Sequence, residues 1–220
     1  MASYHRKNIA MRSNPNIFAY PTESFYALGV PATNAKAIRQ LFRLKRREKG
    51  KPIALIAADI QQVKKFFFMS KDEERLAKKY WPGAVTILLK PKRTIAVSAL
   101  LGGTSPTPLL NRRRGQLRIG VRVPAHPGAR RLAKTLGAPI TATSANISGQ
   151  PPTKSARKVK QSFPGILIMP GRCGKLRQPS TIIKMKKKKI LILRQGSQNL
   201  SSKGTRILGN TIHPVRSSSE

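Results

Sequence analysis

Acidic residues are scarce in this chain of 220 residues, which has 7 Asp and Glu against 44 Lys and Arg and a formal net charge of +37. The one adjacent group of acids, Asp72, Glu73 and Glu74, resembles the first turn of a helix, so the sequence argues against a carboxylate-rich metal site. A charge this large attracts polyanions by releasing their counterions, and nucleic acid is the expected neighbour. The alternative is a generally basic proteome, or drift that removed surface acids, so charge alone assigns no function.

Cysteine and long apolar runs are also scarce. The single cysteine, Cys173, excludes an internal disulfide and cannot form a zinc site alone, so we expect a small residue in the loop GRCGK. No run approaches the roughly 18 apolar residues of a membrane span, and the N-terminal residues lack an apolar signal region. We therefore expect a soluble, cytoplasmic protein with no membrane partner.

The usual catalytic motifs are missing as well. His5 and His213 lie in the terminal segments and His126 sits between two prolines, which gives no support to a Ser-His-Asp triad. The sequence contains neither a GxxxxGK[ST] phosphate loop nor a GxGxxG motif after a strand. If the protein binds a nucleotide, hydroxyls, amides and cations must hold it.

Strands and helices alternate along the chain. Apolar patterns predict strands near 17–20, 53–57, 84–90, 117–124, 139–144, 165–169, 180–185 and 189–194, with helices over 34–48, 60–80, 127–137 and 154–162. We expect loops at 21–29 and 94–114. Several connections are too short for a helical crossover, so the fold class is α/β with an open, twisted, mixed sheet flanked by helices. We expect one catalytic domain over 1–196 and a flexible, basic, Ser- and Gly-rich tail over 197–220.

Hydroxyls, amides and cations recur at the predicted strand ends. They are Thr22, Lys45, Arg47, Arg122, Thr143, Ser144, Asn146, Ser180 and Arg194. Cations neutralise a polyphosphate and stabilise a transferring phosphoryl group, whereas hydroxyls and amides fix orientation. Together they predict an anion-binding cleft without a carboxylate base.

Each of these residues has a plainer interpretation. Thr22, next to Pro21, can simply be part of a turn. The Lys45 and Arg47 pair can be a solvated helix end, and TSANISG can be a capping loop. Ser180 can be a strand-start hydroxyl and Arg194 one more surface cation. Arg122 is the exception, because it interrupts the apolar strand IGVRV, where a buried cation requires a partner or a ligand.

Seven motifs stand in order along the chain: YPTESFYALG, LKRREKGKP, WPGAVT, VRVPAHP, TSANISGQPPT, PST and ILRQG. In this order they resemble the YrdC-domain family, the threonylcarbamoyl-AMP synthases, over about residues 17–196, and SANISG with YPTE is the most specific pair. The resemblance implies a deep, basic, concave cleft. It also implies an enzyme that joins L-threonine, bicarbonate and ATP into threonylcarbamoyl-adenylate and pyrophosphate. The product would pass to a tRNA threonylcarbamoyl transferase complex, which modifies an adenosine beside the anticodon.

The resemblance also implies roles for the residues at the strand ends. Thr22, Arg122 and Ser180 would bind L-threonine, with Arg122 pairing to its carboxylate. The ATP would be held by Lys45, Arg47, Thr143, Ser144, Asn146 and Arg194, with Lys45 and Arg47 as the catalytic cations. Magnesium would arrive on the phosphates, without protein ligands of its own. Glu23 would belong either to the wall of the site or to a local ion pair.

The chain departs from the family pattern at three positions. Glu48 stands where a proline is usual, Arg118 replaces a small hydroxyl residue, and Lys184 replaces an acid. A second hypothesis is therefore a YrdC-like scaffold that binds tRNA or ribosomal RNA with reduced or no catalysis. The charge favours it, whereas an aromatic content of 5% leaves few stacking platforms, and an RNA binder has no reason to keep the site residues. A third hypothesis, another carbamoyl transfer, requires additional domains that we do not find.

Overall fold

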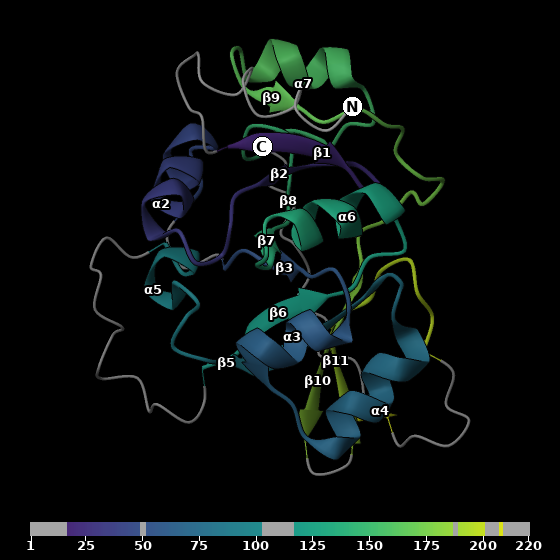
Figure 1. Ribbon diagram of the computed structural model, residues 1–220. Coiled ribbons are helices and arrows are strands. Elements are labelled where there is room, and N and C mark those ends of the chain that lie inside the picture. The colour runs from purple at the N-terminus through teal and green to yellow at the C-terminus, as the bar shows by residue number, and fades with distance from the viewer. Residues whose placement is uncertain (1–16, 49–51, 103–116, 187–188, 201–206, 209–220) are drawn as a thin grey trace, which may run out of the picture.

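The computed structural model of the chain describes residues 17–48, 52–102, 117–186, 189–200 and 207–208 (Figure 1). This part of the chain is an α/β structure of open mixed sheets flanked by helices, which confirms the predicted class, although the strands form two main sheets rather than one. The smaller sheet has the order β8-β2-β1-β9, from Thr143–Ser144, Tyr26–Gly29, Phe18–Pro21 and Leu167–Ile168. The larger sheet has the order β12-β11-β10-β5-β6-β3-β7, from Ile207–Leu208, Lys189–Arg194, Thr181–Lys186, Val85–Pro91, Ile119–Arg122, Leu55–Ile56 and Ile140–Thr141, and β4 (Phe67–Phe68) pairs with β5.

Strand direction decides which chain ends meet at each edge of the larger sheet. Strand β10 runs parallel to β5, whereas β6 runs antiparallel to β5 and β11 runs antiparallel to β10. The carboxyl ends of β6 and β11 therefore lie at the same end of the sheet as the first residues of β5 and β10. This end of the sheet therefore brings together four residues from separate segments: Arg122, Arg194, Thr86 and Ser180.

Six helices of the described chain flank the sheets: α2 (Ala35–Leu44), α3 (Ile60–Phe66), α4 (Lys71–Tyr80), α5 (Val97–Leu100), α6 (Pro127–Thr135) and α7 (Ala156–Ser162). Each long helix begins where a side chain satisfies its free N–H groups. At α4 the Ser70 hydroxyl accepts from Glu73 N, and the Glu73 carboxylate accepts from Ser70 N, a capping box that confirms the predicted helix start at this acidic run. The side chain of His126 caps α6, so this histidine has a structural partner.

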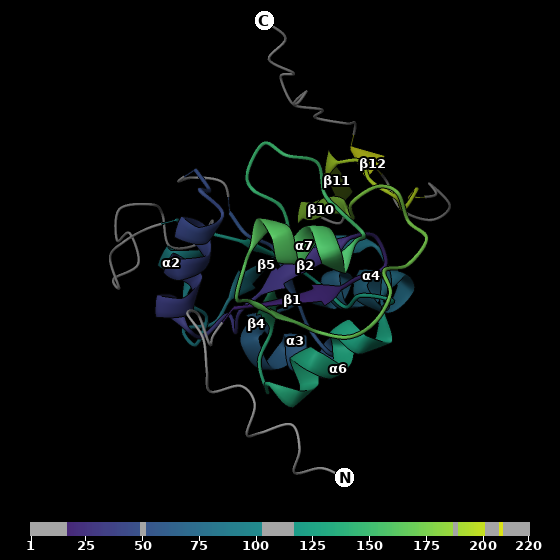
Figure 2. The same ribbon diagram turned by 90° about the horizontal axis from the view of Figure 1, so that it is seen from above.

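The two sheets are joined where the chain passes from β7 to β8. Thr141 ends β7 in the larger sheet, and its N–H donates to Val30 O just beyond β2 of the smaller sheet at 2.9 Å. The buried Tyr20 hydroxyl of β1 donates to Thr141 O at 2.8 Å. Helix α6 contacts both β1 and β3, and Figure 2 shows α7 over the strands of the smaller sheet with α2 to one side. One end of each sheet thus lies beside the other.

Three of the expected elements differ from the structure. Residues 26–29, expected in a loop, form β2, because all four residues are buried and pair with β1. The expected loop over 94–114 contains α5, and its residues 103–114 lie outside the described residues. The expected helix over 60–80 is interrupted by β4, whose Phe67 and Phe68 pair with Pro91 and Lys90 of β5.

Candidate active site

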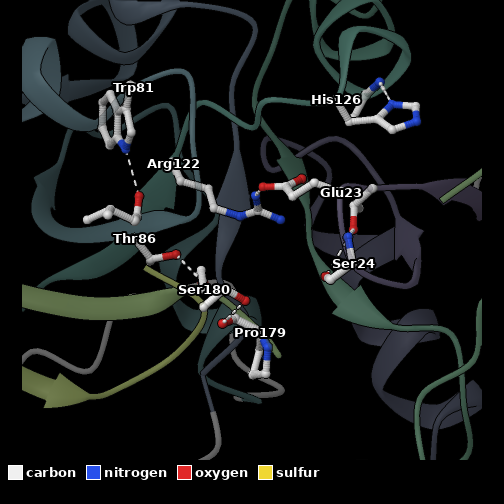
Figure 3. Close-up of polar contacts among 12 residues, drawn as sticks. Glu23, Ser24, Trp81, Thr86, Arg122, His126, Pro179 and Ser180 are labelled. Atoms are coloured by element: carbon white, nitrogen blue, oxygen red, sulfur yellow. Dashed lines mark hydrogen bonds and ion pairs between the residues drawn. The ribbon is translucent and has the colours of Figure 1, made fainter. Parts of the chain in front are cut away.

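Four polar residues meet at the end of the larger sheet where β6 and β11 finish. The hydroxyls of Ser180 and Thr86 lie 2.7 Å apart, and Arg194 Nη2 donates to Ser180 O at 2.8 Å. Burial, followed by the positive charge of Arg122, lowers the pKa of the Arg194 guanidinium. Figure 3 shows Thr86 and Ser180 below the guanidinium of Arg122. Two cations and two hydroxyls held this closely favour an anionic ligand.

Arg122 has the partner that its buried position requires. Its Nη1 donates to Oε1 of Glu23, on the turn between β1 and β2, and both side chains are 10% exposed. Of the two roles left open for Glu23, the structure shows the ion pair. The second carboxylate oxygen, Oε2, is buried and has no hydrogen-bond partner among the described residues. A buried oxygen without a donor is costly, because it has given up its hydration.

Thr22 lies on the same turn as Glu23. Its hydroxyl donates to Phe25 O at 2.8 Å and accepts from the backbone N–H groups of Ser24 and Phe25 at 3.2 and 3.3 Å. This is the local turn that Thr and Ser favour. A second segment holds the turn in place, since Gly174 N donates to Thr22 O at 2.9 Å and Leu176 N donates to Glu23 O at 3.1 Å. The turn therefore places Glu23 opposite Arg122.

Lys45 is the centre of a second polar group at the end of α2. Its ammonium is almost completely buried and donates to the backbone oxygens of Ser144 and Asn146, the latter at 2.7 Å. Asn146 Oδ1 lies 3.5 Å from the same nitrogen. Burial, with a smaller contribution from Arg47, lowers the pKa of Lys45 to about 8. The end of α2 is thereby fastened to the loop that follows β8.

The other predicted nucleotide ligands flank Lys45. Arg47 Nη2 donates to Pro52 O at 3.1 Å, its guanidinium lies 5.9 Å from the centre of the Phe42 ring, and burial lowers its pKa. Thr143 and Ser144 form β8, opposite Leu28 and Ala27 of β2. The structure thus places Ser144 and Asn146 around the ammonium of Lys45.

The β1–β2 hairpin contacts both polar groups, through Glu23 on one side and Tyr26 on the other. Ala145 N donates to Tyr26 O at 2.8 Å, so the loop that carries Asn146 lies only a few residues from Glu23. No described hydrogen bond joins Lys45, Ser144 or Asn146 to Arg122, Ser180 or Arg194. The predicted residues thus fall into an arginine group and a lysine group on either side of the turn.

The departures from the family pattern lie at known places in the structure. Arg118 Nη1 pairs with Glu73 Oε1 at 2.8 Å and donates to Leu88 O at 3.2 Å, which directs the guanidinium to the start of α4. Lys184 lies in β10 opposite Leu191, and Glu48 is exposed after α2. The sequence prediction missed Thr86, whose only signal was a hydroxyl inside an apolar strand.

The described residues contain no group of three or more His, Cys, Asp or Glu side chains that could hold a metal ion. None of their helices has the length and apolarity needed to cross a membrane.

Fold and site together define an α/β protein with cations and hydroxyls gathered at one end of a mixed sheet. A family model for the Sua5, YciO and YrdC proteins, described as telomere recombination, matches residues 11–196, so the chain belongs to this family, as its motifs indicated. Threonylcarbamoyl-AMP synthases of Chromobacterium violaceum and Thiobacillus denitrificans are 37% and 36% identical over 177 residues. These alignments cover 80% of this chain and 85% and 87% of the two relatives.

Solved structures of Sua5 and YciO proteins also match this chain. The crystal structure of P. abyssi Sua5 complexed with L-threonine matches 82% of this chain with a TM-score of 0.69 and 30% identity. This chain spans about half of that one, with 50% covered. E. coli YciO matches with a TM-score of 0.68 and 25% identity over 84% of each chain.

Proposed function

We propose that the protein is a threonylcarbamoyl-AMP synthase, a nucleotidyltransferase that forms threonylcarbamoyl-adenylate and pyrophosphate from L-threonine, bicarbonate and ATP. The observation that carries this proposal is the pair of polar groups on either side of the β1–β2 turn, in a chain up to 37% identical to proteins of that name. One group offers guanidinium and hydroxyl donors, and the other offers a buried ammonium. Two anionic substrates that must react with each other would bind side by side across the turn.

Threonine is assigned to the arginine group. The Arg122 guanidinium has further N–H donors besides the one that binds Glu23, and these would pair with the threonine carboxylate. Ser180 would donate its hydroxyl close to the same ligand. Thr22 would contribute chiefly through its turn, because its hydroxyl is already bonded to the turn backbone.

ATP is assigned to the lysine group together with Arg194. Lys45, Arg47 and Arg194 would neutralise the phosphates, and Thr143, Ser144 and Asn146 would orient the nucleotide through hydroxyls and amides. Carbamate forms when the free threonine amine bonds to the carbon of carbon dioxide derived from bicarbonate, and the proton lost by the nitrogen leaves as water with the hydroxide derived from bicarbonate. One carbamate oxygen then bonds to the α-phosphorus while the bond from that phosphorus to the pyrophosphate oxygen breaks. The rate acceleration would come from positioning of the substrates and neutralisation of the phosphate charge, and Mg²⁺ would be carried on the ATP phosphates.

Pyrophosphate release from purified protein with ATP and bicarbonate, in the presence and absence of L-threonine, tests this proposal. We expect release that depends on threonine and falls by at least about 100-fold in Lys45→Ala and in Arg47→Ala. Lys160→Ala, which removes an exposed lysine from α7, is the matched control and should retain full activity. A folded protein without threonine-dependent release would contradict the proposal.

The product would serve a tRNA threonylcarbamoyl transferase complex in the cytoplasm. Its mixed anhydride is a reactive acyl donor, so transfer to a tRNA adenosine by a second protein is the next step that its chemistry supports. We assign catalysis to residues 1–196 and treat 197–220 as a C-terminal extension, of which Ile207 and Leu208 pair with β11.

A second candidate function, RNA binding, is favoured by one surface feature. Phe68 of β4 is 54% exposed, and the ammonium groups of Lys90 and Lys92 lie 5.5 and 5.4 Å from its ring centre. Because β5 and β10 are parallel, Lys186 comes to the same end of the sheet as Lys90. This end is opposite the one that carries Arg122. An exposed ring among lysines combines base stacking with phosphate contact, the usual features of a single-strand RNA site.

Fluorescence anisotropy with a labelled single-stranded RNA tests this second function. We expect Phe68→Ala and Lys90→Ala each to weaken binding by at least about fivefold, since stacking and phosphate contacts of this kind each contribute about 1 kcal/mol or more. Leu167→Ala, which removes another exposed apolar side chain, and Lys160→Ala are the matched controls. Equal affinity in all four variants would show that charge alone attracts RNA, without a site at Phe68.

A further inference from the structure

The Arg122–Glu23 pair has free bonding capacity on both partners. Among the described residues, Arg122 contacts Glu23 through Nη1 and Glu23 accepts through Oε1 alone, so the contact is end-on rather than bidentate. The remaining guanidinium donors and the second carboxylate oxygen stay side by side at the end of β6 (Figure 3). A cation with spare donors beside an anion with a spare acceptor matches the charges of an α-amino acid zwitterion.

We propose that Glu23 binds the amino group of the amino-acid substrate, with Oε2 as the acceptor. The inference rests on the proposed function, in which Arg122 holds the carboxylate of threonine. In an α-amino acid one carbon separates the ammonium from the carboxylate. A ligand whose carboxylate lies against Arg122 therefore presents its ammonium to the neighbouring carboxylate. The ammonium first releases one proton to solvent to give the free amine, and carbamate formation removes a second proton, which leaves as water with the hydroxide derived from bicarbonate. The nitrogen then keeps one N–H, which can still donate to the same oxygen.

The surroundings of Glu23 support this role. The carboxylate comes from a turn that is fastened on both sides, by the Thr22 hydroxyl and by the backbone of Gly174 and Leu176. A Cβ atom on Gly174 would come within 2.6 Å of Glu23 O, so the two segments touch backbone to backbone. A held carboxylate loses little conformational entropy when a ligand binds. Buried Oε2 also gains a hydrogen bond that no described residue supplies.

The arrangement of the charges gives a second argument. Arg194 lies close enough to Arg122 for the two cations to influence each other, and Glu23 is the one carboxylate paired with them among the described residues. A carboxylate ligand alone would leave Glu23 next to a second anion. The net charge of the two guanidiniums and Glu23 is positive, so it attracts any carboxylate ligand and does not discriminate between an amino acid and a hydroxy acid. Discrimination would come from the ammonium of a zwitterion, which would lie against Glu23 and offset this local repulsion.

Isothermal titration of threonine and of 3-hydroxybutanoate, which has hydrogen in place of the amino group, tests this site. We expect the wild-type protein to bind threonine at least about tenfold more tightly, because the analogue leaves Oε2 unpaired. Glu23→Gln should lose most of this preference by weakening threonine alone, since a neutral amide attracts an ammonium poorly. Glu74→Gln, which removes one negative charge from α4, should keep the preference.

The outcomes separate the inference from the function on which it rests. Equal affinity of the wild-type protein for both ligands would overturn the amino-group site without any variant. If Glu23→Gln weakens the affinity for both ligands equally, Glu23 only positions Arg122 and does not bind the amino group. No binding of threonine by the wild-type protein would overturn the proposed function and this site together.

Discussion

At the scale of the residue, Lys45 is a buried cation of the candidate site whose chemistry differs from that of a surface lysine. Burial lowers its pKa from 10.5 to about 8, so its ammonium loses its charge within an accessible pH range. If Lys45 binds the ATP phosphates, ATP affinity should fall above pH 8 by up to about tenfold per pH unit. Isothermal titration of ATP between pH 7 and pH 10, without threonine, measures this fall.

The free energy of unfolding should change in the opposite direction. Between about pH 8 and the ordinary lysine pKa of 10.5, the unfolded chain binds more protons at this position than the folded one. The contribution of Lys45 to stability therefore rises with pH in that window. Lys45→Met should remove both the loss of ATP affinity and the gain in stability, as measured by urea unfolding. A wild-type ATP affinity that stays constant to pH 10 would contradict the assignment.

The sequence predicts residue contacts well where they are local and poorly where they are distant. The helix start at the acidic run Asp72 to Glu74 was predicted from this local pattern, and the structure shows the capping box of Ser70 and Glu73 there. The need of Arg122 for a partner was also predictable, because a cation interrupts an apolar strand. The identity of that partner was not, since Glu23 lies 99 residues away and only the sheet arrangement joins them. The contact between Thr86 and Ser180, 94 residues apart, was missed for the same reason.

At the scale of the element, the start of β10 and the end of β11 depend on one glycine. A Cβ atom on Gly196 would lie 2.2 Å from Pro179 O and 2.5 Å from Ser180 C, and backbone cannot turn aside as a side chain does. Gly196→Ala should therefore displace Ser180 and Arg194. We expect a loss of about 2 kcal/mol in the free energy of unfolding, typical of overpacking, together with a loss of threonine affinity.

Gly137→Ala is the control for this prediction. Gly137 ends α6 with a φ of +66°, and a Cβ atom there would meet no other atom within 4 Å, so alanine costs only about 1 kcal/mol of backbone strain. The Gly137→Ala variant should bind threonine with the same affinity as the wild-type protein. If Gly196→Ala loses stability but binds threonine normally, the two strand ends do not form the site.

Element boundaries show where sequence patterns lose their information. Strand β2 is buried on both faces, so its residues lack the alternation that marks a half-exposed strand. Helix α5 has only four residues, too few for a helical period to appear. Helix α2, by contrast, has Ile38, Leu41 and Phe42 on one buried face and was predicted from that spacing.

At the scale of the whole molecule, the excess of positive charge is the dominant electrostatic feature. Four acids of the described chain, Glu23, Asp72, Glu73 and Glu74, take part in five ion pairs. They neutralise a small part of a chain with 44 Lys and Arg. Most cations therefore cannot be paired with a carboxylate, and the repulsion among them is larger in the compact folded state than in the unfolded chain.

Salt should consequently stabilise this protein. Between about 20 and 500 mM NaCl the screening length falls well below the dimensions of the domain, so repulsion among the surface cations weakens, while the buried Arg122–Glu23 pair is screened much less. We expect the midpoint of thermal unfolding to rise by several degrees, about the effect of 1 kcal/mol in a domain of this size. Sucrose at matched osmolality is the control, because it stabilises by exclusion from the protein surface without screening charges. A stabilisation caused by screening should be nearly complete by about 500 mM NaCl. A midpoint that falls with salt would show that the ion pairs of α4 and the β1–β2 turn outweigh the repulsion.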